Sequence, residues 1–145
     1  MDKKTRLADP QIQAQWFTRV REAHTMETTE DYVELIADLI HANMEARLSD
    51  LAERFGVSHP TASKVVSRLQ KEGYVVSQPY RSIFLTEKGE ALAKECKARH
   101  QIIVDFLLSI GVPPELAESD AEGIEHHISQ ETLDIFKAKT KKSSS

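Results

Sequence analysis

The 145-residue sequence contains one cysteine, Cys96, so a single chain cannot form a disulfide. Proteins of the reducing cytoplasm use cysteine in this way, and we therefore expect a cytoplasmic location. The longest apolar stretch, residues 101–110, is interrupted by Asp105 and is shorter than the roughly 20 residues that cross a bilayer. The first residues also lack the apolar core of a signal peptide. These absences argue against a disulfide scaffold and a membrane protein.

Lysine and arginine are missing from residues 101–136, a segment that carries eight acidic residues. Such a segment attracts cations and repels nucleic acid. Residues 46–88 have the opposite balance, with seven Lys or Arg against four Asp or Glu, although the net charge of the whole chain is −4. The split predicts that one half of the chain faces phosphate while the other binds cations.

The acidic segment contains the run Asp120–His127, in which Glu122, Glu125 and His126 stand at positions i, i+3 and i+4. Side chains at this spacing share one face of a helix. Two carboxylates and one imidazole suit Mn2+ or Fe2+ better than metals that prefer thiolates, so the run predicts a divalent-cation site. Asp31 and Glu34 form a second pair three residues apart, which taken alone is more typical of a solvated helix face than of a metal site.

Residues 48–73 have the layout of a helix-turn-helix. Gly56 allows a sharp turn, and Ser58 caps the second helix with Pro60 in its first turn. The polar and basic side of this helix would be free to enter a major groove. The predicted DNA contacts of this helix are Ser58, His59, Thr61, Ser63, Lys64, Ser67 and Arg68. The alternative is an ordinary helical hairpin whose basic residues are merely solvated.

Apolar residues alternate with polar ones over residues 74–86, which predicts a two-stranded hairpin with its tip at residues 78–82. A helix-turn-helix followed by such a hairpin is a winged helix. Arg81 at the tip is a candidate for a phosphate or minor-groove contact, although an arginine at a loop tip can also simply face solvent.

The rest of the chain has helical periodicity. It predicts a short amphipathic helix over residues 10–23, a second helix from Thr28 or Thr29, a long helix from about Glu87 to Ile110, and a last helix capped by Ser129. The number of apolar residues beyond residue 101 exceeds what one thin helical layer buries, which predicts a homodimer interface.

The predicted fold class is therefore mostly α, with a winged helix-turn-helix domain and an all-α dimerisation and metal-binding domain. We expect an N-terminal extension with a short helix over residues 1–27 and the DNA-binding domain over 28–88. The helical domain is expected over 89–139, followed by a disordered tail over 140–145.

The winged helix, the segment 98–107 and the run Asp120–His127 together resemble the diphtheria-toxin-repressor family of metal-dependent regulators, in its manganese-responsive branch. The resemblance covers about residues 29–139. In iron-responsive members a cysteine takes the place of Glu122, so the oxygen ligand here favours manganese. Those members also carry a third domain that this chain lacks, and the segment before Thr28 is longer than in shorter members. The metal ligands that the resemblance implies are Asp31, Glu34, His100, Glu122, Glu125 and His126.

The resemblance implies a homodimeric repressor of manganese uptake genes, not an enzyme, with double-stranded DNA as its partner. Two Mn2+ ions are expected per subunit, because four carboxylates match their charge, and they would bridge the two domains. The two recognition helices would then lie roughly 34 Å apart, matching a palindromic operator. No membrane partner and no small-molecule substrate are expected. Three alternatives are an iron-responsive repressor of the same family, a dinuclear carboxylate metalloenzyme, and a redox-sensing regulator that uses Cys96.

Overall fold

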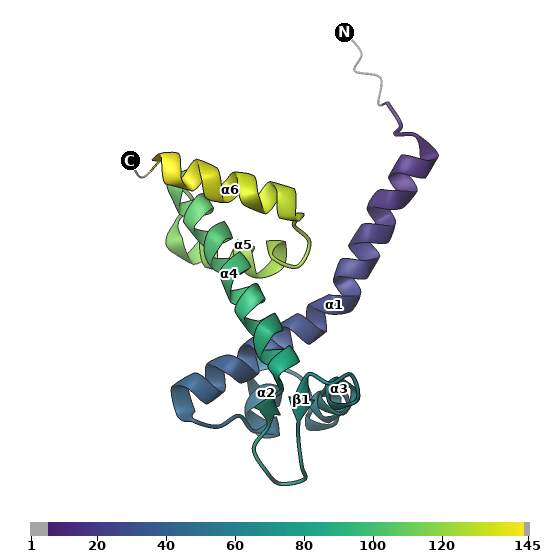
Figure 1. The fold of residues 1–145 in the computed structure, drawn as a ribbon, viewed down its shortest axis with the longest axis vertical. Coiled ribbons are helices and arrows are strands. Elements are labelled where there is room, and N and C mark those ends of the chain that lie inside the picture. The colour runs from purple at the N-terminus through teal and green to yellow at the C-terminus, as the bar shows by residue number, and fades with distance from the viewer. Residues whose placement is uncertain (1–5, 144–145) are drawn as a thin grey trace.

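The structure is a computed structural model that describes residues 6–143, which form six helices and one small hairpin. Figure 1 shows the hairpin and the helix-turn-helix at one end, and the last two helices at the other. The elements are α1 (Pro10–Asn43), α2 (Leu48–Phe55), α3 (His59–Lys71), β1 (Val75–Val76), β2 (Phe84–Leu85), α4 (Glu87–Ser109), α5 (Pro114–Ile124) and α6 (Gln130–Ser143). The mostly α fold class with a winged helix-turn-helix is confirmed.

Helix α1 is continuous over 34 residues, and the prediction of two separate helices was wrong. Asp9 caps its start by accepting a hydrogen bond from the backbone N–H of Gln11, at 2.9 Å. No glycine or proline lies within residues 24–29, so nothing in the backbone breaks the helix there. The expected limit of the N-terminal extension at residue 27 therefore falls inside a helix.

The helix-turn-helix forms as predicted. Gly56 ends α2 with a φ of 67°, a left-handed conformation that glycine adopts without strain. The Ser58 hydroxyl caps α3 by accepting a hydrogen bond from the backbone N–H of Thr61, at 3.2 Å. The hairpin that follows is antiparallel and pairs Val75 with Leu85, although each strand is only two residues long.

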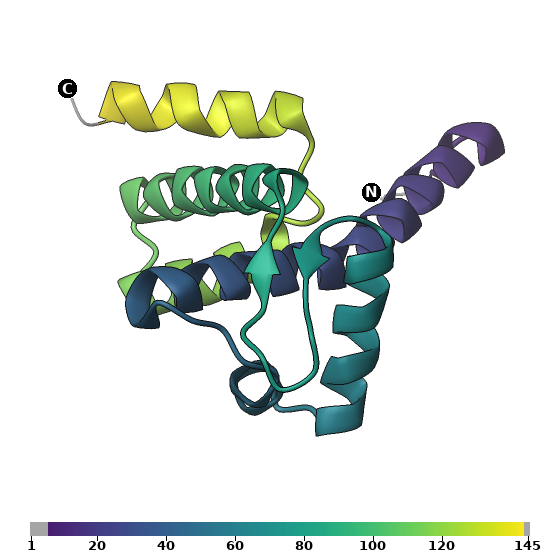
Figure 2. The same ribbon diagram turned by 60° about the horizontal axis from the view of Figure 1, so that its bottom comes forward.

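Two hydrophobic cores lie at opposite ends of the molecule, and α1 and α4 connect them. Figure 2 shows α4 lying between α1 and α6. The first core packs α1 against the helix-turn-helix and the hairpin, with Ile36, Leu51, Leu69 and Ile83 almost inaccessible to solvent. The second core joins α4, α5 and α6. Ligands placed on α1 and α4 can therefore join both halves.

Several of the apolar residues that suggested a dimer interface pack inside the chain instead. Ile103 and Leu133 belong to the second core, whereas Ile110, Leu116 and Ile135 are exposed. The exposed members leave an apolar surface on the helical domain that a second copy can cover.

The C-terminal residues differ from the prediction of a disordered tail. Helix α6 continues to Ser143, beginning after Ser129, whose hydroxyl accepts a hydrogen bond from the backbone N–H of Thr132 at 3.2 Å. Residues 140–143 of the expected tail are therefore helical. Residues 1–5 and 144–145 lie outside the described part of the chain. Among the described helices, none combines the length and apolar character that crossing a membrane requires.

The hairpin and α4 approach each other so closely at Gly89 that a side chain there would overlap the carbonyl oxygen of Tyr74. We expect Gly89→Ala to lower the free energy of unfolding by about 1–3 kcal/mol, because the obstacle is backbone rather than a flexible side chain. Gly123→Ala is the matched control, since a Cβ there meets no atom within 4 Å and α5 gains up to about 1 kcal/mol of helix propensity. Urea unfolding of both variants measures the difference, and equal stabilities would contradict this close approach.

Candidate metal centre

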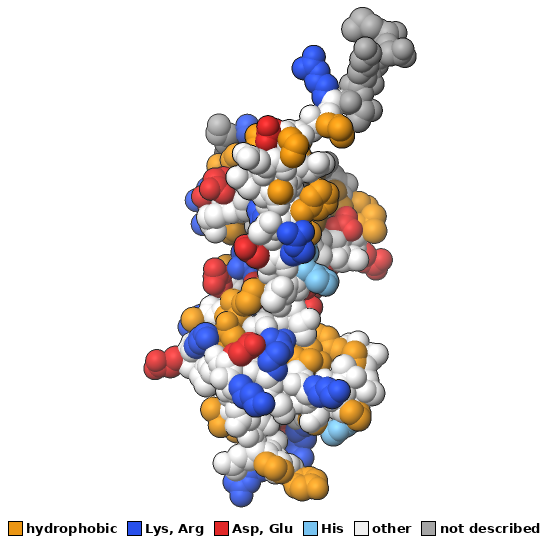
Figure 3. All heavy atoms as spheres, turned by 90° about the vertical axis from the view of Figure 1, so that its right-hand side faces the viewer, with side chains coloured by type: hydrophobic (Ala, Val, Ile, Leu, Met, Phe, Trp, Pro, Cys, Tyr) orange, Lys and Arg blue, Asp and Glu red, His pale blue; other side chains and the backbone are white. Residues whose placement is uncertain are grey.

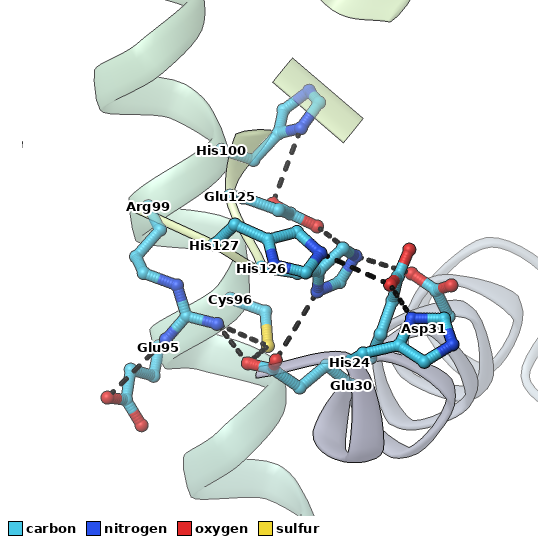
Figure 4. A network of polar contacts seen from close by, with 11 residues as sticks. His24, Glu30, Asp31, Glu95, Cys96, Arg99, His100, Glu125, His126 and His127 are labelled. Atoms are coloured by element: carbon cyan, nitrogen blue, oxygen red, sulfur yellow. Dashed lines mark hydrogen bonds and ion pairs between the residues drawn. The ribbon is translucent and has the colours of Figure 1, made fainter. Parts of the chain in front are cut away.

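Three segments distant in sequence meet between the two cores: the middle of α1, residue His100 of α4, and the turn of residues 125–127 that follows α5 (Figure 4). Helix α5 ends at Ile124, so Glu125 and His126 lie in this turn rather than on the helix that was predicted. The backbone N–H of Glu125 still donates to the carbonyl of Ala121 at 3.0 Å, which continues the helical spiral for one more turn.

One group of ligand atoms consists of His100, Glu122 and Glu125, whose side-chain atoms lie within 4.8 Å of one another. His100 Nδ1 is 3.5 Å from Glu122 Oε1 and 3.5 Å from Glu125 Oε2. The other ring nitrogen of His100, Nε2, forms a hydrogen bond with Glu118 Oε2 at 2.7 Å. Glu118 therefore orients the ring and leaves Nδ1 directed at the two carboxylates.

A second group consists of Glu27, Asp31 and His126. His126 Nε2 lies 2.9 Å from Asp31 Oδ1 and 3.5 Å from Glu125 Oε1. The two oxygens of Glu125 thus face different groups, Oε2 toward His100 and Oε1 toward His126. This carboxylate therefore lies between the two groups of candidate ligand atoms.

Glu34 lies beside these groups but has no atom within either of them. It lines an open pocket of about 290 Å3 together with Asp31 and Glu122. Burial and the negative charge of Glu122 raise the pKa of Glu34. Five of the six predicted ligands therefore fall into the two groups, and the sixth adjoins them.

Glu125 is fully buried, and no described residue donates a hydrogen bond to either of its oxygens. The nearby histidine nitrogens are at ion-pair distance but lack hydrogen-bond geometry. Burial, followed by the negative charges of Glu34 and Glu122, raises the pKa of Glu125 to about 8. A buried carboxylate without donors is costly, and a cation would satisfy both oxygens. The donor set of carboxylates and imidazoles fits Mn2+ or Fe2+.

His126 lies in a cage of carboxylates. Burial lowers its pKa, but hydrogen bonds with Asp31 and Glu30 outweigh burial and raise the pKa to about 10. Glu30 Oε1 is 3.3 Å from His126 Nδ1, and the other Glu30 oxygen pairs with Arg99. The ring must lose a proton before Nε2 can act as a ligand, so binding of a cation here would be coupled to proton release.

Cys96 donates a hydrogen bond from Sγ to Glu30 at 3.4 Å and is completely buried. Burial, and then the negative charge of Glu30, raises the pKa of the Cys96 thiol far above its usual range. A thiol in this environment stays protonated and unreactive, which removes the physical basis for a redox sensor at Cys96.

The sequence prediction missed three acidic residues near the ligands: Glu27, Glu30 and Glu118. Glu27 stands three residues before Glu30 and four before Asp31, and Glu30 stands four residues before Glu34. These helical spacings were the signal for Glu27 and Glu30. Glu118 stands one helical turn before Glu122, so the same spacing rule also indicated it. None of these spacings reveals which residue turns toward the ligands and which pairs with Arg99.

The predicted nucleic-acid surface lies on α3 and the hairpin. A groove of about 560 Å3 runs between them, lined by His59, Ser63 and Ser67 of α3 and by Arg81 of the hairpin tip. The other predicted contacts, Ser58, Thr61 and Lys64, are exposed. Figure 3 shows Lys and Arg side chains spread over this half of the molecule.

Arg68 is a predicted DNA contact whose side chain also joins α3 to another helix. Its Nη1 pairs with Glu72 at 3.1 Å and donates to the hydroxyl of buried Thr29 at 3.3 Å. Arg68 therefore holds α3 against α1 immediately beside Glu30. Its contact with DNA stays a prediction.

Comparison with protein families matches two adjoining parts of the chain. Residues 24–83 match the model described as "Iron dependent repressor, N-terminal DNA binding domain". Residues 86–143 match the model described as "Iron dependent repressor, metal binding and dimerisation domain". The boundary at residues 83–86 falls on β2, the second strand of the hairpin, immediately before α4.

Two curated relatives are similar over nearly the whole chain. "Transcriptional regulator MntR" of Escherichia coli O157:H7 is 51% identical over 97% of this chain and 90% of its own length. The protein with the same name from Salmonella typhimurium is 52% identical over 95% and 88%. A solved structure, "Manganese-dependent transcriptional repressor complex with manganese", matches 77% of this chain with a TM-score of 0.70 and 28% identity. This chain spans about half, 51%, of the length of that structure.

The raised pKa of Glu125 predicts how stability depends on pH in chelator. Between 4.5 and about 8 the folded protein binds the Glu125 proton and the unfolded chain does not, so the free energy of unfolding falls as pH rises. Glu125→Gln should flatten this slope and stabilise the protein at pH 8 by on the order of 2 kcal/mol. In the Glu125→Gln variant the free energy of unfolding should still fall somewhat as pH rises above 6.5, because the pKa of His126 is also raised in the folded protein. Urea unfolding of the wild type and of Glu125→Gln over this pH range measures the two slopes. Identical slopes would refute the raised pKa of Glu125.

Proposed function

The chain belongs to the iron-dependent repressor family, and we propose that it is a manganese-responsive repressor of manganese uptake genes. Within this family it is a DNA-binding transcriptional regulator and not an enzyme. The observation that carries the proposal is the buried Glu125, whose two oxygens face two separate groups of ligands. This arrangement supports two divalent ions per subunit.

Manganese is favoured by the chemistry of the ligands. The six proposed ligands offer four carboxylates and two imidazoles, and no thiol lies among them. Oxygen-rich sets of this type suit Mn2+, whereas the softer sulfur ligands shift preference toward other metals. The names of the Escherichia coli and Salmonella typhimurium relatives and the manganese in the similar solved structure support the same choice. Fe2+, which accepts similar ligands, is the competing ion.

The proposed ligands lie on elements that belong to both halves. Asp31 and Glu34 lie on α1, whose core residues pack against the helix-turn-helix, while the other four lie on α4, α5 and the turn after α5. A bound ion supplies the positive charge that offsets the repulsion among these carboxylates. The contact between Arg68 and Thr29 then ties the position of α3 to the same stretch of α1.

The partners we propose are a second copy of the chain and a palindromic DNA operator. The dimerisation domain of the family and the exposed Ile110, Leu116 and Ile135 support a homodimer. A two-fold symmetric dimer presents two recognition helices to two half-sites, which is the geometric reason for a palindrome. Such a protein works beside the chromosome, which supports a cytoplasmic location.

Binding of a labelled palindrome from a manganese-transporter promoter, followed by fluorescence anisotropy, tests this function. We expect Mn2+ to tighten operator binding by about 5- to 150-fold over chelator, the usual range of coupling between two sites. Fe2+, Zn2+ and Mg2+ at equal free concentration should tighten it less. Lys64→Ala should weaken binding to every sequence, because Lys64 is exposed on α3, whereas Lys94→Ala on α4 is the matched control.

Equal operator affinity in chelator and in Mn2+ would contradict a manganese-responsive function. A larger effect of Fe2+ than of Mn2+ would replace the proposed ion and leave the rest of the account standing.

A further inference from the structure

We propose that His24, Glu27 and His127 form a third divalent-cation site, which takes an ion that favours imidazole, with Zn2+ as the reference. The two histidines lie outside the six proposed ligands, so the site goes beyond the proposed function. Side-chain atoms of the three residues lie within 4.8 Å of one another.

Both imidazoles are directed at one oxygen of Glu27. His24 Nδ1 lies 3.2 Å from Glu27 Oε2, and His127 Nε2 lies 3.4 Å from the same atom. His24 and Glu27 are one turn apart on α1, whereas His127 comes from the turn after α5, one hundred residues further along the chain. Figure 4 shows the rings of His24 and His127 close to Asp31 and His126.

Contacts of the backbone place His127 here independently of its ring. Arg19 Nη2 donates to the carbonyl oxygen of His127 at 3.0 Å, and the backbone N–H of His127 donates to Ile124 at 3.0 Å. The first contact joins the N-terminal half of α1 to the turn, and the second fixes the turn itself. The ligand from the far segment is therefore already in position, which lowers the entropic cost of binding an ion.

The donor set differs from that of the main centre. Two nitrogens and one oxygen make a softer site, and imidazole suits Zn2+, Ni2+ and Fe2+ better than Mn2+. Three protein ligands plus water is a common arrangement around Zn2+. The side chain of His24 is 80% exposed, that of His127 36% and that of Glu27 31%, so water can complete the coordination.

Glu27 makes this site a neighbour of the main centre, because its carboxylate also lies within 4.8 Å of ligand atoms from Asp31 and His126. An ion held by His24 and His127 would fasten the N-terminal half of α1, which projects away from the body of the protein in Figure 1, to the turn that carries His126. The family match begins only at residue 24, so most of this half of α1 precedes it.

Equilibrium dialysis of the full-length, metal-free protein against Zn2+ counts the ions bound per chain. We expect His24→Ala to lose one equivalent, or to weaken its binding at least tenfold, with the remaining equivalents unchanged. His41→Ala is the matched control, because His41 is also exposed on α1 and belongs to none of the clusters among the described residues. His24 is largely exposed, so its substitution should leave the circular dichroism spectrum unchanged.

Equal numbers of Zn2+ ions on the wild type, His24→Ala and His41→Ala would overturn the third site and would show that the histidines only pair with Glu27. The Glu125→Gln variant separates this question from the proposed function. Glu125→Gln should still bind the Zn2+ ion that His24→Ala loses, even if Mn2+ no longer tightens its binding to the operator.

Discussion

The buried carboxyl group of Glu125 lies where the two halves of the protein meet, and its two oxygens receive no hydrogen bond from the described residues. The nearby carboxylates of Glu34 and Glu122 add to the cost of ionising it. A protein core tolerates such a group when a cation is a regular partner, because attraction to the ion outweighs the loss of hydration. The protein alone therefore favours the protonated form of Glu125, whereas a bound cation would favour the ionised carboxylate.

Helix α1 connects the proposed cation site around Glu125 to the DNA-binding half of the protein. Within one stretch it carries Asp31, which contacts His126, Glu30, which pairs with Arg99 of α4, and Thr29, which accepts a hydrogen bond from Arg68 of α3. A shift of the ligands changes the position of this stretch, and the recognition helix is held directly against it. The same continuous helix reaches the first core, so the coupling passes through packed structure rather than through a loop.

The local parts of the fold could be predicted from the sequence because their signals are local. Gly56 and Ser58 specify the turn and the cap, and the residue spacing in Asp120–His127 indicated which side chains gather in the candidate metal centre. The continuity of α1 was missed, because the polar residues between its two apolar stretches look like a break in the pattern although they permit a helix. The pairing of Glu30 with Arg99 depends on how α1 crosses α4, which no spacing along the chain contains.

The distance between the two recognition helices of the dimer tests the central claim, that ions between the halves fix the orientation of the DNA-binding domains. Spin labels at Lys71→Cys, an exposed position at the end of α3, report this distance by pulsed electron resonance, while buried Cys96 stays unlabelled. The account predicts a broad distribution in chelator. When a diamagnetic ion that supports operator binding saturates the site, the distances should form one narrow distribution. Its value should fit two recognition helices one DNA turn apart, roughly 34 Å. The same distribution under both conditions would contradict it.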